Sequence, residues 1–163
     1  MTITVQLAPN PATEELVNLS VDSSQVEFVG VVSDILQASL AKPSESQWVI
    51  YSNDIAVGFF LLDQDYANTI DGVPKGAIGL RAFFIDQRYQ GLGLAKAAIK
   101  LITQGFSTWL NQSCTELYLT VNCRNKPAYE LYIKSGFVDT QTLYLGGEAG
   151  PQHIMCFKSK KMP

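Results

Sequence analysis

A glycine-rich loop holds the residues whose types and spacing point most directly to chemistry. Residues 88–96 read Arg-Tyr-Gln-Gly-Leu-Gly-Leu-Ala-Lys, with small residues at Gly91, Gly93 and Ala95. Small residues let backbone N–H groups approach a ligand closely, and a helix that begins here would add about half a positive charge at its N-terminus. The loop therefore suits a phosphate or pyrophosphate, and the alternative is a plain strand-to-helix turn. Lys96 stands where a Rossmann fingerprint needs a small residue, and the glycine spacing differs from that of a P-loop.

The sulfur and imidazole side chains offer little further chemistry. Cys114, Cys123 and Cys156 are an odd number without C-x-x-C spacing, and His153 is the single histidine. The sequence therefore predicts neither a disulfide framework nor a metal site. Cys123 lies near the expected site, but no histidine base neighbours it in the sequence, so we expect a half-buried cysteine rather than an acyl-carrying nucleophile.

The length and composition indicate one globular domain over residues 1–163. Hydrophobic residues make up 47% of the chain and charged residues 17%, which is enough apolar surface for a core. No apolar stretch approaches the ~20 residues that cross a bilayer, and Lys42 is the first basic residue, so we expect no membrane span, no leader and a cytoplasmic location. The net charge of -3 argues against a nucleic-acid partner or an anionic membrane surface, because both select basic proteins.

The charges are divided unevenly between the two halves of the chain. Residues 1–74 hold ten acids and one base, a charge of -9, whereas residues 75–163 hold eleven bases and five acids, a charge of +6, and the two values give the total of -3. If both halves line one cleft, its first wall attracts cations and its second wall attracts anions. The alternative is uneven decoration of the surface.

Hydrophobic periodicity and turn residues predict the elements that must position these side chains. Asn53 and Asp54 mark a turn between two strands, Ser33 and Asn125 are candidate helix N-caps, and Gly136 is a helix stop. The order is β-α-α-β-β-β-α-β-α-β-β, an α+β arrangement that contains a βαβ crossover. The expected strands are residues 2–7, 48–52, 55–63, 77–85, 116–121, 137–145 and 153–157, and the expected helices are residues 13–19, 31–40, 92–110 and 126–134.

The glycine-rich loop and a later segment resemble the two signatures of the GNAT superfamily of acyl-CoA-dependent N-acyltransferases. The first signature is matched by Gln90-x-x-Gly93-x-Ala95. The resemblance implies a mixed, mostly antiparallel sheet of six to seven strands flanked by about four helices, with acetyl-CoA as co-substrate and no metal. The second signature, Asn-x-x-Ala-x-x-x-Tyr-x-x-x-Gly-Phe, is matched at Asn125, Ala128, Tyr132, Gly136 and Phe137.

The resemblance also implies which residues bind the cofactor. Edge amides of the third meander strand would hold the pantetheine arm and the acetyl carbonyl where the third and fourth strands splay apart. Amides of the glycine-rich loop would hold the pyrophosphate, and Asn125 would reach the pantetheine or the nearby backbone. The expected cofactor-binding residues are Phe83, Phe84, Ile85, Gln90, Gly91, Leu92, Gly93, Leu94, Ala95, Lys96, Asn125 and Tyr132.

By the same resemblance, Tyr132 is the catalytic acid that protonates the departing thiolate of CoA. A tyrosine with a pKa near ~10 and a thiol with a pKa near ~8.5 are a workable pair. Without the signature, Tyr132 would be read as an aromatic residue that packs a helix onto the sheet. The acetyl group would pass directly to the amine in a ternary complex. The amine must first lose a proton, and Glu27 and Asp63 are the acids we expect nearest the cleft, either as proton acceptors or as ordinary carboxylates.

The strand before the loop resembles the branch of the family that acetylates spermine, spermidine and diamines. The resembling residues are 83–86 and 88–91, together with an early Gln-x-x-Phe-Val that contains Phe28. That branch carries an acid where this chain has Arg81, which would instead bind a carboxylate of an amino acid, peptide or amine drug. A non-catalytic CoA-binding module is a third reading, and a homodimer is left open. The candidate substrate residues are Glu27, Phe28, Asp63 and Arg81.

Overall fold

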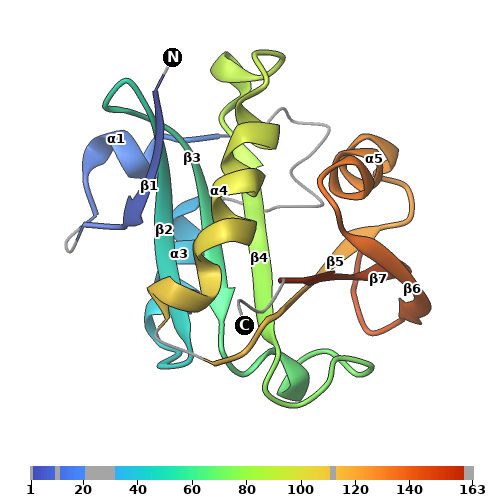
Figure 1. Cartoon of the computed structure of the whole chain (residues 1–163). Coiled ribbons are helices and arrows are strands. Elements are labelled where there is room, and N and C mark those ends of the chain that lie inside the picture. The colour runs from blue at the N-terminus through green and yellow to red at the C-terminus, as the bar shows by residue number, and fades with distance from the viewer. Residues whose placement is uncertain (1, 10–11, 21–31, 111–112, 160–163) are drawn as a thin grey trace.

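A seven-stranded sheet in the order β1-β2-β3-β4-β5-β7-β6 forms the centre of the computed structural model, which describes residues 2–9, 12–20, 32–110 and 113–159 (Figure 1). Only the β4–β5 pair is parallel within this sheet. The expected α+β class and element order are confirmed. The strands are β1 Ile3–Leu7, β2 Glu45–Ser52, β3 Ile55–Asp63, β4 Ile78–Ile85, β5 Glu116–Asn122, β6 Val138–Tyr144 and β7 Gln152–Lys158, and the described α-helices are α1 Glu14–Val17, α3 Val32–Leu40, α4 Leu94–Trp109 and α5 Lys126–Lys134.

Several element boundaries differ from the sequence-based expectation, and the starts of β2 and α4 are among them. β2 begins at Glu45 rather than at residue 48, because residues 45–47 pair with residues 61–63 of β3 although their side chains are polar. α4 begins at Leu94 rather than at residue 92, because Gly93 takes a left-handed φ of 77° at the N-cap position. Ser33 lies inside α3, so its expected N-cap role was wrong.

Helices cover the two faces of the sheet, and β3 shows how the sequence divides between them. Successive strand residues point to opposite faces. Phe60 and Leu62 belong to the core cluster that contains Ile99 of α4, whereas Phe59 and Leu61 belong to the cluster that includes residues of α1 and α3. Every β3 residue after Ile55 is therefore buried, as a central strand requires.

β4 and β5 separate soon after they meet. Ile78 pairs with Leu117 and Gly79 with Tyr118, and no later pair joins the two strands in the described part of the chain. Figure 1 shows β5 and its partners β7 and β6 leading away from β4. The splay that the family resemblance implies is thus present, and it leaves one edge of β4 free of strand partners from about residue 80 onward.

A single-turn 3-10 helix, η2 (Tyr66–Asn68), packs at the base of this splay. A side chain on Gly79 would overlap the ring of Tyr66, so the glycine is what lets the ring lie against β4. The Tyr66 hydroxyl donates to Thr120 Oγ1 of β5 at 3.4 Å. Tyr66 therefore bridges the two strands where their own hydrogen bonds end.

A β-bulge reshapes β4 within the stretch that no longer pairs with β5. Phe59 pairs with Phe84 and Leu61 with Arg81, so two residues of β4 stand opposite one residue of β3. Ala82, the first of the two, has a φ of 53°, a left-handed conformation that is uncommon for a residue with a side chain. The bulge changes the direction of the backbone where residues 83–85 begin.

No helix in the described ranges is both long and apolar enough to cross a membrane.

Candidate active site

The glycine-rich loop, residues 88–96, has the left-handed backbone conformations that its glycines suggest. Gly91 and Gly93 have φ values of 81° and 77°, and a Cβ on either would face open space. The two glycines are therefore required by backbone conformation rather than by crowding. The side chain of Gln90 donates from Nε2 to the Ile85 carbonyl oxygen at 2.9 Å, which links the loop to the end of β4. The open N-terminal turn of α4 follows at once.

A cleft of about 310 Å³ lies between this loop, the free edge of β4 and α5. The structure thus brings together most of the residues that were expected to bind the cofactor, although Leu92 is exposed and is not in the cleft wall. The expected residues in the wall are Phe83, Phe84, Ile85, Gln90, Gly91, Gly93, Leu94, Ala95, Lys96, Asn125 and Tyr132.

A second and larger cavity, of about 790 Å³, adjoins the cleft. Its wall comes from α3, the start of β2, η2, the strands β3 to β5, α5, and the ends of β6 and β7 with the residues between them. Four residues belong to both walls, namely Phe83, Asn125, Ala128 and Tyr132. A molecule in the cleft and a molecule in the cavity would therefore meet at Tyr132.

Tyr132 is held in place by aromatic neighbours. It is 8% exposed, and its ring lies edge-on to Phe137 at 5.5 Å and to Phe83 at 6.4 Å between centroids. Burial raises the pKa of the Tyr132 hydroxyl well above its ordinary value, with a smaller contribution from Tyr66. The phenol consequently stays protonated at neutral pH. A residue that lines both spaces and carries a protonated hydroxyl has the chemistry of a proton donor.

Asn125 begins the helix that carries Tyr132. Its Oδ1 accepts the backbone N–H of Ala128 at 3.4 Å, so the expected N-cap role is confirmed. Gly136, with a φ of 99°, follows the end of the helix as expected for a stop residue. The second sequence signature is therefore, in part, a description of the short helix α5 and its two ends.

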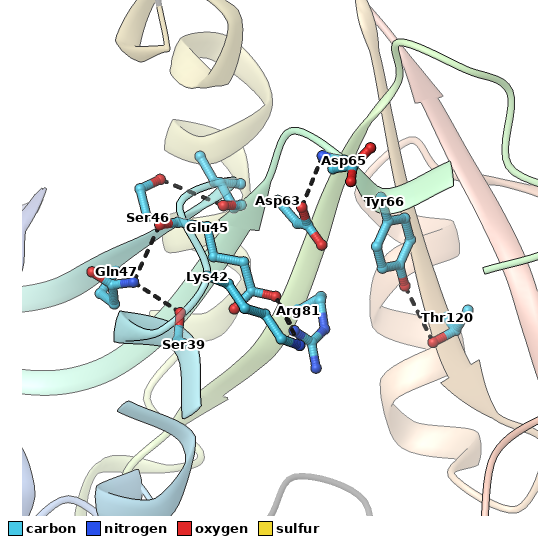
Figure 2. Close-up of polar contacts among 11 residues, drawn as sticks. Ser39, Lys42, Glu45, Ser46, Gln47, Asp63, Asp65, Tyr66, Arg81 and Thr120 are labelled. Atoms are coloured by element: carbon cyan, nitrogen blue, oxygen red, sulfur yellow. Dashed lines mark hydrogen bonds and ion pairs between the residues drawn. The ribbon is translucent and has the colours of Figure 1, made fainter. Parts of the chain in front are cut away.

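Arg81 does not stand alone in the larger cavity. Its Nη1 donates to Glu45 Oε2, and Lys42 Nζ lies 3.9 Å from the same oxygen (Figure 2). Glu45 was missed by the sequence analysis, because residues 45–47 are polar and were assigned to the segment before β2. The only sequence signal for Glu45 is its position, three residues before the apolar run that begins at Trp48.

Of the other expected substrate residues, the structure describes only Asp63, which lies outside the two cavity walls. Asp63 is buried at the end of β3, where its Oδ1 accepts the backbone N–H of Asp65 at 2.8 Å, and it is absent from both cavity walls. Its carboxylate therefore caps the turn into η2. Glu27 and Phe28 lie outside the described residues.

Comparisons with known proteins agree with this geometry. A model described as the acetyltransferase (GNAT) family matches residues 13–137. The uncharacterized N-acetyltransferase YbbJ of Bacillus subtilis (strain 168) is 29% identical over 134 residues, which cover 77% of this chain and 78% of that protein. The spermine/spermidine N(1)-acetyltransferase of the same strain is 27% identical over 158 residues, which cover 91% of this chain and 95% of that protein.

Solved structures show the same fold. The spermidine N-acetyltransferase from Vibrio cholerae, crystallised in complex with CoA and spermine, superposes with a TM-score of 0.70. The match covers 96% of this chain and 95% of that chain at 17% sequence identity. Since the identity is low, the likeness supports the arrangement of strands and helices and no finer statement.

Proposed function

The chain belongs to the GNAT acetyltransferase family, and we propose that it transfers the acetyl group of acetyl-CoA directly to a primary amine in a ternary complex. The observation that carries the proposal is the position of Tyr132 in the walls of both the cleft and the larger cavity. Acetyl-CoA would lie in the cleft and the amine in the cavity. The reacting atoms would then meet beside a buried, protonated hydroxyl.

The cleft supplies donors for the cofactor. Backbone N–H groups of the loop, together with the N-terminus of α4, suit the pyrophosphate. Beyond Gly79, the edge of β4 that faces β5 has no strand partner in the described chain, so its N–H groups are available to the pantetheine arm and the acetyl carbonyl. A donor aimed at this carbonyl would stabilise the negative charge that develops on its oxygen, by roughly 3 kcal/mol per donor.

The transfer itself needs two proton movements. The acceptor ammonium loses a proton, because only the neutral amine has a lone pair, and its nitrogen then attacks the thioester carbon. The C–S bond breaks as the C–N bond forms, and Tyr132 gives its proton to the departing thiolate. The described residues that line the junction include no cysteine, so the geometry favours direct transfer over an acetyl-cysteine intermediate.

A polyamine is the acceptor that we favour. Its support is the similarity to the spermine/spermidine N(1)-acetyltransferase of Bacillus subtilis, the charge of -9 over residues 1–74, and the three acids Asp34, Glu45 and Glu148 in the wall of the larger cavity. Arg81 is already paired with Glu45, which reduces its repulsion of an ammonium. The second candidate is an amine that bears a carboxylate, because the Arg81 side chain is 33% exposed in the same cavity.

A thiol-release screen with acetyl-CoA tests the proposal. We expect amine-dependent release of CoA with spermidine or spermine, and mass spectrometry should find one acetyl group added to the amine. Amino acids, short peptides and aminoglycosides are the comparison acceptors. If CoA binds but no amine is acetylated, the chain is a CoA-binding module and the proposed enzymatic function is wrong.

A further inference from the structure

The wall of the larger cavity includes a residue with a buried carboxylate, and only one of its two oxygens has a hydrogen-bond partner. The side chain of Glu45 is 1% exposed. Its Oε2 accepts from Arg81 and lies near Lys42, whereas its buried Oε1 has no hydrogen-bond partner among the described residues (Figure 2). A carboxylate accepts hydrogen bonds on both oxygens, and a buried acceptor without a donor costs free energy. Glu45 therefore has one acceptor oxygen without a donor, on a residue that belongs to the cavity wall.

We propose that Glu45 binds a second cationic group of the acceptor amine, and that Arg81 occupies this position until the acceptor arrives. The inference rests on the proposed amine acetylation, because it concerns the far end of the same substrate. The acceptor class is an extended chain with one ammonium at each end. One end loses its proton and is acetylated beside Tyr132, while the other end exchanges with the Arg81 guanidinium at Glu45.

Exposure decides which partner of the ion pair can move. Glu45 is enclosed, whereas Arg81 is one third exposed, so the guanidinium can turn into the cavity while the carboxylate stays. An ammonium brings three N–H donors and one positive charge, which suffices to replace the guanidinium and to reach Oε1 as well. If Arg81 stayed, three cations would crowd around the Glu45 carboxylate, namely Arg81, Lys42 and the ammonium of the ligand. These three cations would repel one another.

The cavity can also receive the displaced guanidinium. Asp34 and Glu148 line the same cavity and supply two further carboxylates. The exchange therefore moves Arg81 from one acidic environment to another and keeps one ion pair at Glu45. A ligand carboxylate, by contrast, would compete with Glu45 for Arg81. It would also be repelled by the Glu45 carboxylate as it approached.

The register of β4 sets the length of the acceptor. Arg81 precedes residues 83–85 by two to four positions, which is at most about 7–13 Å at ~3.3 Å per strand residue, since the bulge at Ala82 shortens this path. An extended chain advances about 1.2 Å per bond, since it spans at most about 3.6 Å over three backbone bonds. The two nitrogens of a matching acceptor are therefore separated by at most roughly six to eleven bonds.

A matched series of six-carbon ligands tests the proposal. 1,6-Diaminohexane, n-hexylamine and 6-aminohexanoate differ only in the group at the far end, which is cationic, neutral or anionic. Calorimetry with the CoA-saturated protein measures their binding without any transfer step. We expect the wild type to bind the diamine most tightly of the three.

Two single variants should shift this binding in opposite directions. Glu45→Gln removes the charge and should weaken diamine binding by about tenfold or more, while n-hexylamine changes by less than about twofold. Arg81→Gln keeps a donor for Glu45 Oε2 but removes the competing cation, so diamine binding should tighten several-fold. Asp54→Asn in the exposed β2–β3 turn and Lys100→Gln on the exposed side of α4 are charge-matched controls and should change neither.

The opposite results would overturn the proposal. These are an unchanged diamine affinity in Glu45→Gln, a weaker one in Arg81→Gln, or a loss in Arg81→Gln that is confined to 6-aminohexanoate. The double variant Glu45→Gln/Arg81→Gln guards against misfolding, because two amides can still hydrogen-bond to each other. It should fold and lose the preference for the diamine over n-hexylamine, and a retained preference would contradict the assignment.

The failure of this inference is distinguishable from the failure of the proposed function. Binding of the series requires no acetyl transfer, so it reports on Glu45 even if no amine is acetylated. Conversely, spermidine could be acetylated at a normal rate in Glu45→Gln with an unchanged KM. That result would contradict the proposed cation site at Glu45 and would be compatible with the proposed acetyltransferase function.

Discussion

Tyr132 has a packing role in the structure and a catalytic role in the proposed reaction. Its ring fills the space between Phe83 and Phe137, which is a structural role that any aromatic residue could share. The residue also lines both the cleft and the larger cavity, and phenylalanine at this position would keep the ring but lack the hydroxyl. The two roles can therefore be separated by removing a single oxygen atom.

Tyr132→Phe should lower kcat by roughly 10² to 10⁴, the range expected when a general acid is lost. The affinity for acetyl-CoA should change little, because the ring and its contacts remain. Steady-state kinetics on the identified amine, together with calorimetric titration of acetyl-CoA, measure the two quantities. An unchanged kcat would mean that Tyr132 only packs and that water protonates the thiolate.

At the scale of elements, the loop before α4 contains two left-handed glycines, Gly91 and Gly93, and the left-handed Gly76 lies outside this loop. Gly93 is the N-cap of α4 at a φ of 77°, and Gly76, before β4, has a φ of 91° with equally open surroundings. Both positions impose the same backbone requirement, but only Gly93 lines the cofactor cleft. Gly76 is therefore a matched control for Gly93.

Gly93→Val and Gly76→Val should each lose roughly 1–2 kcal/mol of folding stability, because a side chain is disfavoured at a left-handed φ. Only Gly93→Val should also abolish acetyl-CoA binding, since its side chain would block the approach of the pyrophosphate to the backbone. Urea unfolding and calorimetry measure the two effects. Equal acetyl-CoA affinities in the two folded variants would contradict the assigned pyrophosphate site.

Asp86 joins Ser20, three residues after α1, to the turn after β4. Its buried carboxylate accepts the backbone N–H groups of Ser20 and Arg88, each at 2.9 Å, and Arg88 Nε at 2.8 Å. Burial alone would raise the pKa of Asp86, but hydrogen bonds from Arg88 and Ser20 and the charge of Arg88 outweigh it and hold the pKa below its ordinary value. A carboxyl whose pKa is lowered on folding stabilises the fold above its unfolded pKa of about 3.9.

Asp86→Asn should therefore reduce the free energy of unfolding at pH 7 by roughly 1–3 kcal/mol. The difference from wild type should shrink below about pH 4, because the wild-type carboxyl then loses its advantage as the pH falls through its folded pKa. Urea unfolding at pH 7 and pH 3 measures both values, with Asp54→Asn as the exposed control. A difference that is equal at the two pH values would exclude an ionised Asp86 as its source.

At the scale of the whole molecule, hydrophobic periodicity was enough to predict the order of strands and helices. It was not enough for the start of β2, because Glu45, Ser46 and Gln47 pair with β3 through their backbones and show no apolar alternation. The splay between β4 and β5 came from the family resemblance, since no residue pattern marks where a parallel pair ends.

The candidate site was predictable in its local parts and not in its long-range ones. The glycine-rich loop and α5 are continuous segments, so their residue spacing indicates their geometry. The ion pair of Arg81 and Glu45 depends on the registers of β2, β3 and β4 together, which also determine that Asp63 caps a turn instead of lining the cavity. A single sequence does not specify such registers.

Initial-rate kinetics with acetyl-CoA and spermidine both varied test the central claim most directly. Direct transfer at the junction of two adjoining spaces requires both substrates to be bound at once, so double-reciprocal plots should give intersecting lines. Parallel lines with a burst of CoA release before any amine is added would instead show a covalent acetyl-enzyme and contradict the account.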